Sequence, residues 1–280
     1  MFGRNRIDVK TPGQIRKMRV AGLVVGETLA LIRGRASAGM TTADLDAAAE
    51  EFIRGKGATP SFLGYHGFTG SLCVSVNEEV VHGIPGPRTL QVGDLVSIDC
   101  GAIVDGWHGD AAISLIVGGR EAGSQRDLAL VDATEASMWA GITALAVGSP
   151  LYDVGAAVED YIVEAGRANG EAYGIVEDYV GHGIGTEMHQ DPQVPNYRVR
   201  DRGPIVRSGV AVAIEPMVTL GSAETDVLGD DWTVVTRDGS PAAHWENSVA
   251  VTDAGIWVLT ALDGGQQRLE ALGAAYGPLI

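Results

Sequence analysis

Part of the chain occurs twice, and this duplication constrains the fold more than any other feature. The stretch GMTTADLDAAAEEFIRGKGA, which begins at Gly39, resembles GSPLYDVGAAVEDYIVEAGR, which begins at Gly148. Both stretches carry apolar residues at helical spacing. Each follows another helix-like segment, residues 11–35 and 125–147, and the first of these starts with Thr11 as N-cap and a proline at the first helical position.

The similarity continues beyond the helices into strand-like segments. VGDLVSID, from Val92, aligns with SGVAVAIE, from Ser208, and HGDAAISLIV, from His108, aligns with HWENSVAVTD, from His244. Each half therefore has α-α-β-β character. A duplication of this kind predicts an α+β domain whose two pseudo-symmetric halves bring their sheets together around an axis.

Two aspartates stand among apolar neighbours in the stretch SIDCGAIVDGWHGDAAI, residues 97–113. Asp105-Gly106 favours the two-residue turn of a β-hairpin. With the turn at that position, Asp99 and Asp110 are diagonal neighbours on one face of the hairpin. Because two unpaired buried charges are costly, the pair is exposed, or one carboxyl is protonated, or a cation lies between them.

The repeat supplies a second pair of acids. The alignment of the two halves matches Asp99 with Glu215 and Asp110 with Glu246. Four carboxylates are thus expected to converge at the axis between the halves. Shared ancestry would also explain four exposed acids at matching positions, but it does not explain why each acid lies within an apolar strand.

A pair of divalent cations would balance the four negative charges. His182, in GHGIG, is the best nitrogen ligand in the sequence, because its glycine neighbours allow close approach of the backbone. The repeat alignment pairs it with His66, in YHG. We therefore predict a dinuclear metal site.

Length and charge exclude several other classes of protein. A chain of 280 residues with 45% hydrophobic residues is long enough to form one large domain with a substantial core. Its formal charge of −16 argues against a nucleic-acid or anionic-membrane binder. We find no signal peptide or transmembrane span and expect a cytoplasmic protein whose two cysteines are reduced and buried.

The motifs resemble those of type I methionine aminopeptidases, which have the duplicated pita-bread fold. The resemblance runs from about residue 11 to 260 and includes GYHGF, SVNEEVVHGIPG, IDCGAIVDGWHGDAA, GHGIGTEMHQDPQVPNY, AIEPM and HWENSVAVT. It implies one catalytic domain, residues 11–263, with halves at about 11–120 and 125–263. An N-terminal extension, residues 1–10, and a C-terminal tail, residues 264–280, would flank it.

The resemblance also implies a set of catalytic roles. Divalent metals, two of Co, Mn, Fe or Zn, would activate a water for attack on the scissile carbonyl. Glu215 would be the general base, and His82 and His189 would hydrogen-bond the substrate. The implied metal ligands are Asp99, Asp110, His182, Glu215 and Glu246, with Asp110 and Glu246 bridging the two metals.

A soft, apolar slot for a methionine side chain follows from the same resemblance. Its lining would be Tyr65, Phe68, Cys73, Met188 and Trp232, with His66 at the rim.

Three positions depart from the family pattern. Met188 replaces a common aromatic residue, Asn247 replaces the usual His after Glu246, and Ala242 replaces a hydroxyl residue of a monovalent-cation site built from carbonyls near Asn77 and Glu79. That monovalent site is therefore doubtful here. The same holds for support of the Glu246 ligand by a neighbouring side chain, which the usual His would provide.

The implied function is removal of the initiator methionine from nascent proteins and peptides, with a preference for a small second residue. We expect a monomer whose partners are polypeptide N-termini, with transient ribosome contact compatible with that role. An alternative is a prolidase or Xaa-Pro aminopeptidase, although these relatives usually carry a large N-terminal domain and have EPG where this chain has EPM. A non-catalytic peptide-binding module is a second alternative.

Overall fold

The computed structural model describes residues 7–279, so the first six residues of the predicted extension and the last residue of the predicted tail lie outside it. The helices are α1 (Pro12–Arg35), α2 (Thr42–Gly55), α3 (Gln125–Ala144), α4 (Asp153–Asn169) and α5 (Gln266–Ala271). The strands are β1 (Thr59–Pro60), β2 (Leu72–Val76), β3 (Glu79–Val81), β4 (Leu95–Val104), β5 (Trp107–Ile116), β6 (Gly174–Ile175), β7 (Gly181–Gly183), β8 (Gln190–Val194), β9 (Ala211–Ile214), β10 (Met217–Thr219), β11 (Thr225–Val227), β12 (Val234–Thr236), β13 (Ala242–His244), β14 (Glu246–Thr252) and β15 (Gly255–Val258). Two short 3₁₀ turns are η1 (Tyr65–Gly67) and η2 (Arg120–Ala122).

The four predicted helices are present, and the predicted start of the first is confirmed. Thr11 caps α1 by accepting a hydrogen bond from the N–H of Gln14, and Pro12 is its first residue. The third helix ends at Ala144 rather than at the predicted Val147. There the chain turns, and the Ser149 hydroxyl donates to the Ala146 carbonyl.

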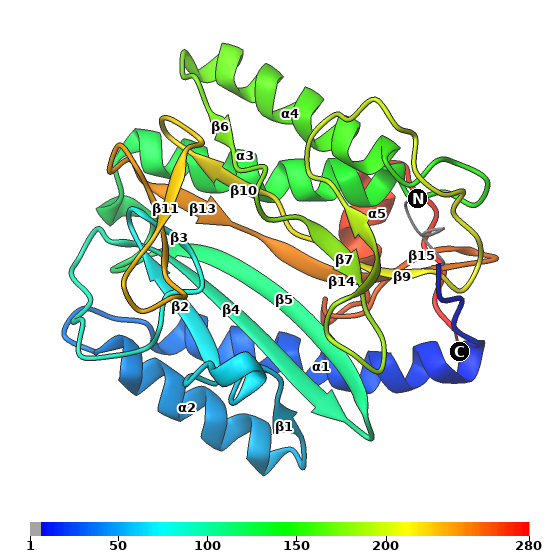
Figure 1. The fold of residues 1–280 in the computed structure, drawn as a ribbon, viewed down its shortest axis with the longest axis horizontal. Coiled ribbons are helices and arrows are strands. Elements are labelled where there is room, and N and C mark those ends of the chain that lie inside the picture. Colours follow the sequence, from blue (N-terminus) through cyan, green and yellow to red (C-terminus); the bar gives the residue numbers. More distant parts are fainter. Residues whose placement is uncertain (1–6, 280) are drawn as a thin grey trace.

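The strand order of the main sheet reflects the duplication of the sequence. Its main path is β1-β4-β5-β14-β9-β7-β8, with β2 beside β4 and β15 beside β14. The axis between the halves therefore runs between β5 and β14, and β4 corresponds to β9 and β2 to β7. Figure 1 shows α1 and α2 on one side of these strands and α3 and α4 on the other. The predicted α+β architecture of two halves is confirmed.

The hairpin β4-β5 has the predicted register. Asp105 and Gly106 form its turn with φ of 49° and 77°. Gly101 pairs with Asp110, and Asp99 pairs with Ala112. The two aspartates are thus diagonal neighbours on one face, as the position of the turn predicts.

The last part of the described chain folds back onto the sheet. Helix α5 follows Asp263, Tyr276 bridges to Ile256, and the Thr252 hydroxyl donates to the Gly277 carbonyl at 2.9 Å. Within residues 7–279, no helix is both long enough and apolar enough to cross a membrane.

Candidate metal centre and adjoining pocket

Four neighbouring strands deliver one carboxylate each to the axis between the halves. Asp99 lies on β4, Asp110 on β5 and Glu246 on β14, while Glu215 directly follows β9. Ala112 pairs with Asp99 on one side and with Glu246 on the other. The row across the sheet therefore has a small side chain between two acids, and all four predicted carboxylates line one cavity.

The protein interior disfavours charge on these acids. Burial raises the pKa of Asp99 to about 7. Burial followed by the charges of neighbouring carboxylates raises the pKa values of Asp110, Glu215 and Glu246 well above their usual range. Such a cluster is stabilised either by protons or by cations.

Several buried ligand atoms here lack a partner, and this observation tests whether the residues fit a metal. Asp99 Oδ1, Asp110 Oδ1 and Glu246 Oε1 are buried and have no hydrogen-bond partner among residues 7–279. Buried polar atoms are normally satisfied. Carboxylate oxygens with an accompanying imidazole are a suitable donor set for first-row divalent cations. The residues fit the predicted metals.

His182 points a lone pair at the acids. Its Nδ1 lies 3.0 Å from the Gly183 carbonyl oxygen, which can only accept, so Nδ1 carries the proton. Its Nε2 lies 3.4 Å from Glu215 Oε1. Burial lowers the pKa of His182 to about 3, which keeps the imidazole neutral, as a metal ligand requires.

The glycines beside His182 allow the close approach that the sequence predicts. A Cβ at Gly181 would lie 2.4 Å from the Ala213 carbonyl oxygen, and one at Gly183 would lie 2.2 Å from that of Asp191. Larger residues would push β7 away from its neighbours and carry His182 with it.

The repeat alignment of His66 with His182 is not reproduced in three dimensions. Strand β2 holds the place beside β4 that β7 holds beside β9. His66 lies outside β2, in the turn η1, with φ of 47°. The sequence match arose from a short glycine-flanked pattern rather than from equivalent positions.

Two groups of potential ligand atoms lie close enough to hold a cation. One comprises Asp110, His182 and Glu246, and the other comprises Glu215, His244 and Glu246, with donor atoms within 4.8 Å of one another in each. His244 was missed as a site residue in the sequence. Its position two residues before Glu246 was the available signal, because alternate strand residues share a face.

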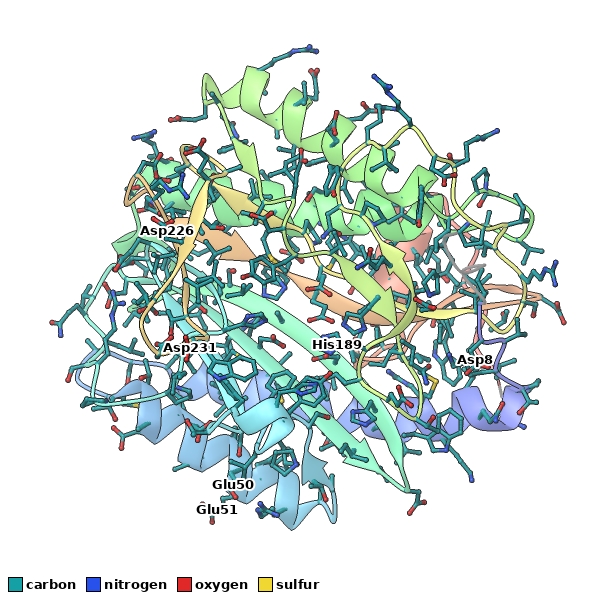
Figure 2. The ribbon with its side chains drawn as sticks, in the orientation of Figure 1. Asp8, Glu50, Glu51, His189, Asp226 and Asp231 are labelled. Carbon is teal, nitrogen blue, oxygen red and sulfur yellow. The ribbon has the colours of Figure 1, made fainter. Side chains whose placement is uncertain are left out.

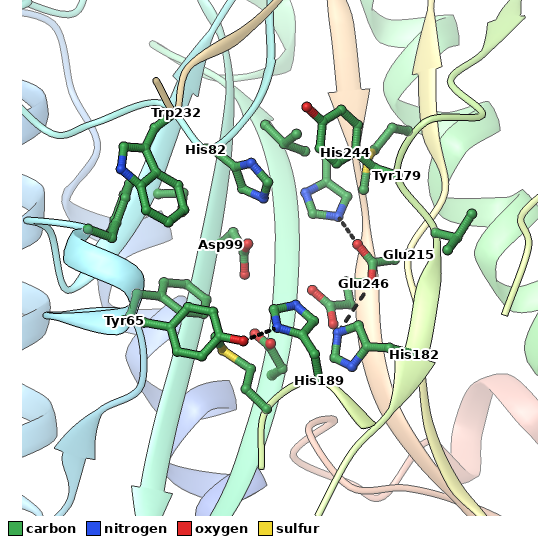
Figure 3. A pocket seen from close by; sticks show the side chains of 18 of the residues that line it. Tyr65, His82, Asp99, Tyr179, His182, His189, Glu215, Trp232, His244 and Glu246 are labelled. Carbon is green, nitrogen blue, oxygen red and sulfur yellow. Dashed lines mark hydrogen bonds and ion pairs between the residues drawn. The ribbon is translucent and has the colours of Figure 1, made fainter. Parts of the chain in front are cut away.

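The two predicted outer histidines also line the cavity. The Tyr65 hydroxyl lies 2.9 Å from His189 Nδ1. The ring of His82 meets that of Tyr179 edge to face at 5.4 Å between centroids. Burial lowers the pKa of His82 to about 4, so its imidazole is neutral at pH 7. Figure 3 shows His82 and His189 facing the acids from opposite sides of Asp99.

Acidic residues elsewhere have a different setting. In Figure 2, Glu50 and Glu51 lie at the lower edge of the molecule, whereas His189 lies near the centre of the view. Asp226 and Asp231 are exposed. Not all of the surface charge is remote from the carboxylate cluster, because the exposed Asp178 lines the same cavity.

An apolar pocket adjoins the carboxylates. Cys73 on β2 pairs with Asp99, so this wall of the pocket directly borders a predicted ligand. Phe68 meets Trp232 edge to face at 5.0 Å between centroids. The pocket cluster contains Phe62, Tyr65, Phe68, Cys73, Ile84, Met188 and Trp232.

The structure brings five of the six residues predicted for the slot into this cluster. His66 is the exception, because its ring packs edge to face on Tyr65 at 4.4 Å and does not line the cavity of about 280 Å³. Phe62 and Tyr179 also line that cavity and were missed, since neither lies in a pattern that distinguishes it from core. The Cys73 thiol stays protonated, because burial and then the neighbouring carboxylates raise its pKa well above the usual range.

Asn247 and Ala242, which differ from the family pattern, both make hydrogen bonds that explain how they are accommodated. Asn247 accepts a hydrogen bond from Thr260 at 2.7 Å and donates to the Met138 sulfur at 3.4 Å, so its amide is occupied away from Glu246. The N–H of Ala242 donates to the Asn77 carbonyl at 2.9 Å. Ala242 therefore offers this carbonyl a backbone partner but no hydroxyl oxygen.

Comparison with known proteins places this site in context. Residues 16–253 match the model of metallopeptidase family M24. Methionine aminopeptidase 1 of Mycobacterium tuberculosis is 52% identical over 259 residues, which cover 92% of this chain and 96% of the relative. Methionine aminopeptidase of Escherichia coli is 39% identical, over 91% and 94% of the two chains.

Solved structures give the same picture at the level of the fold. Methionine aminopeptidase from Thermotoga maritima superposes with a TM-score of 0.86 and 38% identity, covering 91% of this chain and 100% of that one. Prolidase from Pyrococcus furiosus superposes with a TM-score of 0.70 at 18% identity, covering 90% of this chain and 65% of that one, which is a likeness of fold alone.

Proposed function

Because the chain belongs to metallopeptidase family M24 and, within it, to the methionine aminopeptidases, we propose that it removes the N-terminal methionine from polypeptides. This membership confirms the predicted resemblance and the pita-bread fold. The observation that carries the proposal is the convergence of Asp99, Asp110, Glu215 and Glu246 with His182 beside an apolar pocket. We assign the activity to residues 11–263 and to the cytoplasm, acting as a monomer on newly made chains.

The cofactor we propose is a pair of divalent cations. Two such cations match the charge of the four carboxylates, and the unpartnered oxygens of Asp99, Asp110 and Glu246 support their binding there. Co, Mn, Fe and Zn all suit oxygen donors combined with imidazole. We do not include a monovalent cation, because Ala242 supplies no side-chain oxygen.

When bound, the cations supply Lewis-acid activation of the attacking water and of the scissile carbonyl. Glu215 accepts the proton of that water, since its carboxylate reaches into the cavity beside His182. His82 and His189 donate hydrogen bonds to the substrate amide and to the charge that develops on its carbonyl oxygen. The hydroxyl of Tyr65 orients the His189 ring.

The pocket recognises the side chain that is removed. Phe68, Cys73, Met188 and Trp232 offer a sulfur-rich and aromatic wall, which suits a thioether. We propose that the residue after methionine must be small, because it lies where His82 and His189 close on the scissile bond.

A pair of tetrapeptides tests this function. Metal-stripped protein is incubated with Met-Gly-Met-Met and with Gly-Pro-Met-Met, each with and without Co²⁺ or Mn²⁺, and the released amino acids are measured. We expect metal-dependent release of methionine from the first peptide and no cleavage of the second. Cleavage of Gly-Pro alone would indicate a prolidase, and no cleavage with any metal would indicate a peptide-binding module.

A further inference from the structure

His244 is buried at the edge of the metal centre, and its main chain is hydrogen-bonded on two sides. It is 2% exposed, and Met217 on β10 pairs with it. Its backbone N–H donates to the hydroxyls of Ser97 and Ser114, which lie on the two strands of the β4-β5 hairpin. The Ser114 hydroxyl donates in turn to the backbone carbonyl of His244. The main chain of His244 is thus held by both strands of the hairpin that carries Asp99 and Asp110, and its buried side chain lines the same cavity as these acids.

The Nε2 atom of His244 has no protein partner. It is buried and makes no hydrogen bond within residues 7–279. It lies 3.9 Å from Glu215 Oε2, which is too long for a hydrogen bond. Two donors on one cation are separated by up to about 4.2 Å, twice the usual bond length of about 2.1 Å, so this gap is compatible with an intervening ion.

The two potential ligand groups differ in their nitrogen donor. Asp110 and Glu246 come with His182, while Glu215 and Glu246 come with His244, and Glu246 belongs to both. Figure 3 shows Glu215 between the two imidazoles. Each cation position can therefore receive one imidazole.

We propose that His244 is a sixth protein ligand of the metal centre, binding a divalent cation through Nε2. The inference rests on the proposed metal-dependent function and adds a nitrogen donor to the five predicted ligands. An extra imidazole favours Co²⁺, Fe²⁺ or Zn²⁺ over Mn²⁺ at that position, because imidazole is a softer donor than carboxylate.

His108 provides a matched control. It precedes Asp110 by two residues as His244 precedes Glu246, and the repeat aligns the two histidines. Its Nδ1 lies 3.1 Å from the Ser61 hydroxyl. Among the described residues it belongs to neither potential ligand group.

Proton NMR of the protein loaded with two equivalents of Co²⁺ tests the assignment. Each Co²⁺-bound imidazole gives a strongly shifted, solvent-exchangeable N–H signal. We expect two such signals in the wild-type protein and in His108→Gln. We expect one in His244→Gln and one in His182→Gln, with different signals lost. The number of shifted signals in the wild-type protein tests the proposal even if a variant fails to fold.

Calorimetric titration with Co²⁺ gives an independent readout. Removing a residue that hydrogen-bonds a metal ligand commonly weakens metal binding by about 10–100-fold. Removing a ligand itself should therefore weaken the binding of one of the two cations at least about tenfold. His244→Gln should show this loss, and His108→Gln should not. A single imidazole signal in the wild-type protein, or wild-type spectrum and affinity in His244→Gln, would overturn the proposal.

Methionine release measured on the same samples separates this inference from the proposed function. Release by a wild-type protein with one imidazole signal would overturn the ligand assignment and leave the aminopeptidase intact. Two signals that respond to the variants as expected, without release of methionine, would support the ligand and contradict the aminopeptidase.

Discussion

At the scale of single residues, Glu215 has the most demanding role. It approaches His182 at 3.4 Å with one oxygen, and burial together with the Asp110 and Asp99 charges raises its pKa. A group of this kind binds a cation and also accepts a proton, and both tasks need the carboxylate.

Glu215→Gln should therefore lower kcat about 10²–10⁴-fold, because an amide neither accepts the proton nor balances cation charge. The measurement is methionine release from Met-Gly-Met-Met at saturating metal. Glu224→Gln, at an exposed acid paired with Arg237, is the control and should leave kcat unchanged. Near-normal turnover of folded, metal-loaded Glu215→Gln would show that another group takes the proton.

Asp99 should make the metal-free protein sensitive to pH. Its pKa is about 7 in the folded chain against a usual 3.8, so the folded state binds more protons than the unfolded state between those values. The free energy of unfolding therefore falls as pH rises from about 4 to about 7.

Asp99→Asn removes this charge. In the presence of a chelator, the variant should be more stable than wild type at pH 8, on the order of 4 kcal/mol, because the pKa lies about three units above its usual value and one pKa unit corresponds to about 1.4 kcal/mol. At pH 4 the difference should nearly disappear. Urea unfolding across this range measures it, and a difference that does not change with pH would contradict the account.

At the scale of elements, helix α1 must approach the hairpin closely to hold it in place. Gly22 lies on the face that meets the sheet, and a Cβ there would sit 2.2 Å from the Leu259 carbonyl oxygen. Gly109 on β5 faces the same contact, with a Cβ position 2.7 Å from the Gly22 nitrogen. The neighbouring Asp110 consequently faces the cavity.

Gly22→Ala should lower the free energy of unfolding by about 1–3 kcal/mol, because backbone atoms must move to admit the methyl group. Gly34→Ala, in the same helix with nothing within 4 Å of its Cβ position, should be neutral or stabilising by up to about 1 kcal/mol. Chemical denaturation of both variants measures the contrast. Equal effects would show that α1 tolerates a shift away from the sheet.

The helices and the central hairpin could be predicted because their signals are local. Thr11 and Pro12 mark a helix start, and Asp105-Gly106 fixes the register that makes Asp99 and Asp110 neighbours. The alignment of the two halves then identified Glu215 and Glu246 as the counterparts of these aspartates. Each of these predictions depends only on residues that are close in the sequence or on the internal repeat.

Features that depend on contacts between distant segments were harder to predict. His66 matched His182 by its glycine neighbours, but strand pairing places it in a separate turn. His244 was missed because the groups that surround it, the Ser97 and Ser114 hydroxyls and the Glu215 carboxylate, lie far away in the sequence. Phe62 has no signal that separates a pocket wall from core.

At the scale of the whole molecule, the metal centre joins the two halves. The acids come from β4 and β5 of one half and from β14 and the residue after β9 of the other, and the cations would bind all four. Metal binding should therefore stabilise the domain as a unit, because an unfolded chain does not hold these groups together.

Calorimetry of the stripped protein with and without Co²⁺ measures this linkage. Free cation at 100 times its Kd should add about 2.7 kcal/mol of stability and raise Tm by several degrees. Asp110→Ala should stay folded, show little of this rise and release no methionine. A Tm response equal to that of wild type would contradict the assignment of Asp110 to the centre.

The most direct test of the central claim is a titration of metal-stripped protein with Co²⁺, in which bound metal per chain and methionine release from Met-Gly-Met-Met are measured on the same samples. The carboxylate cluster predicts no release without metal, and release that rises with bound metal and reaches its plateau by two ions per chain. Full release in excess chelator, or binding of two ions with no release, would contradict it.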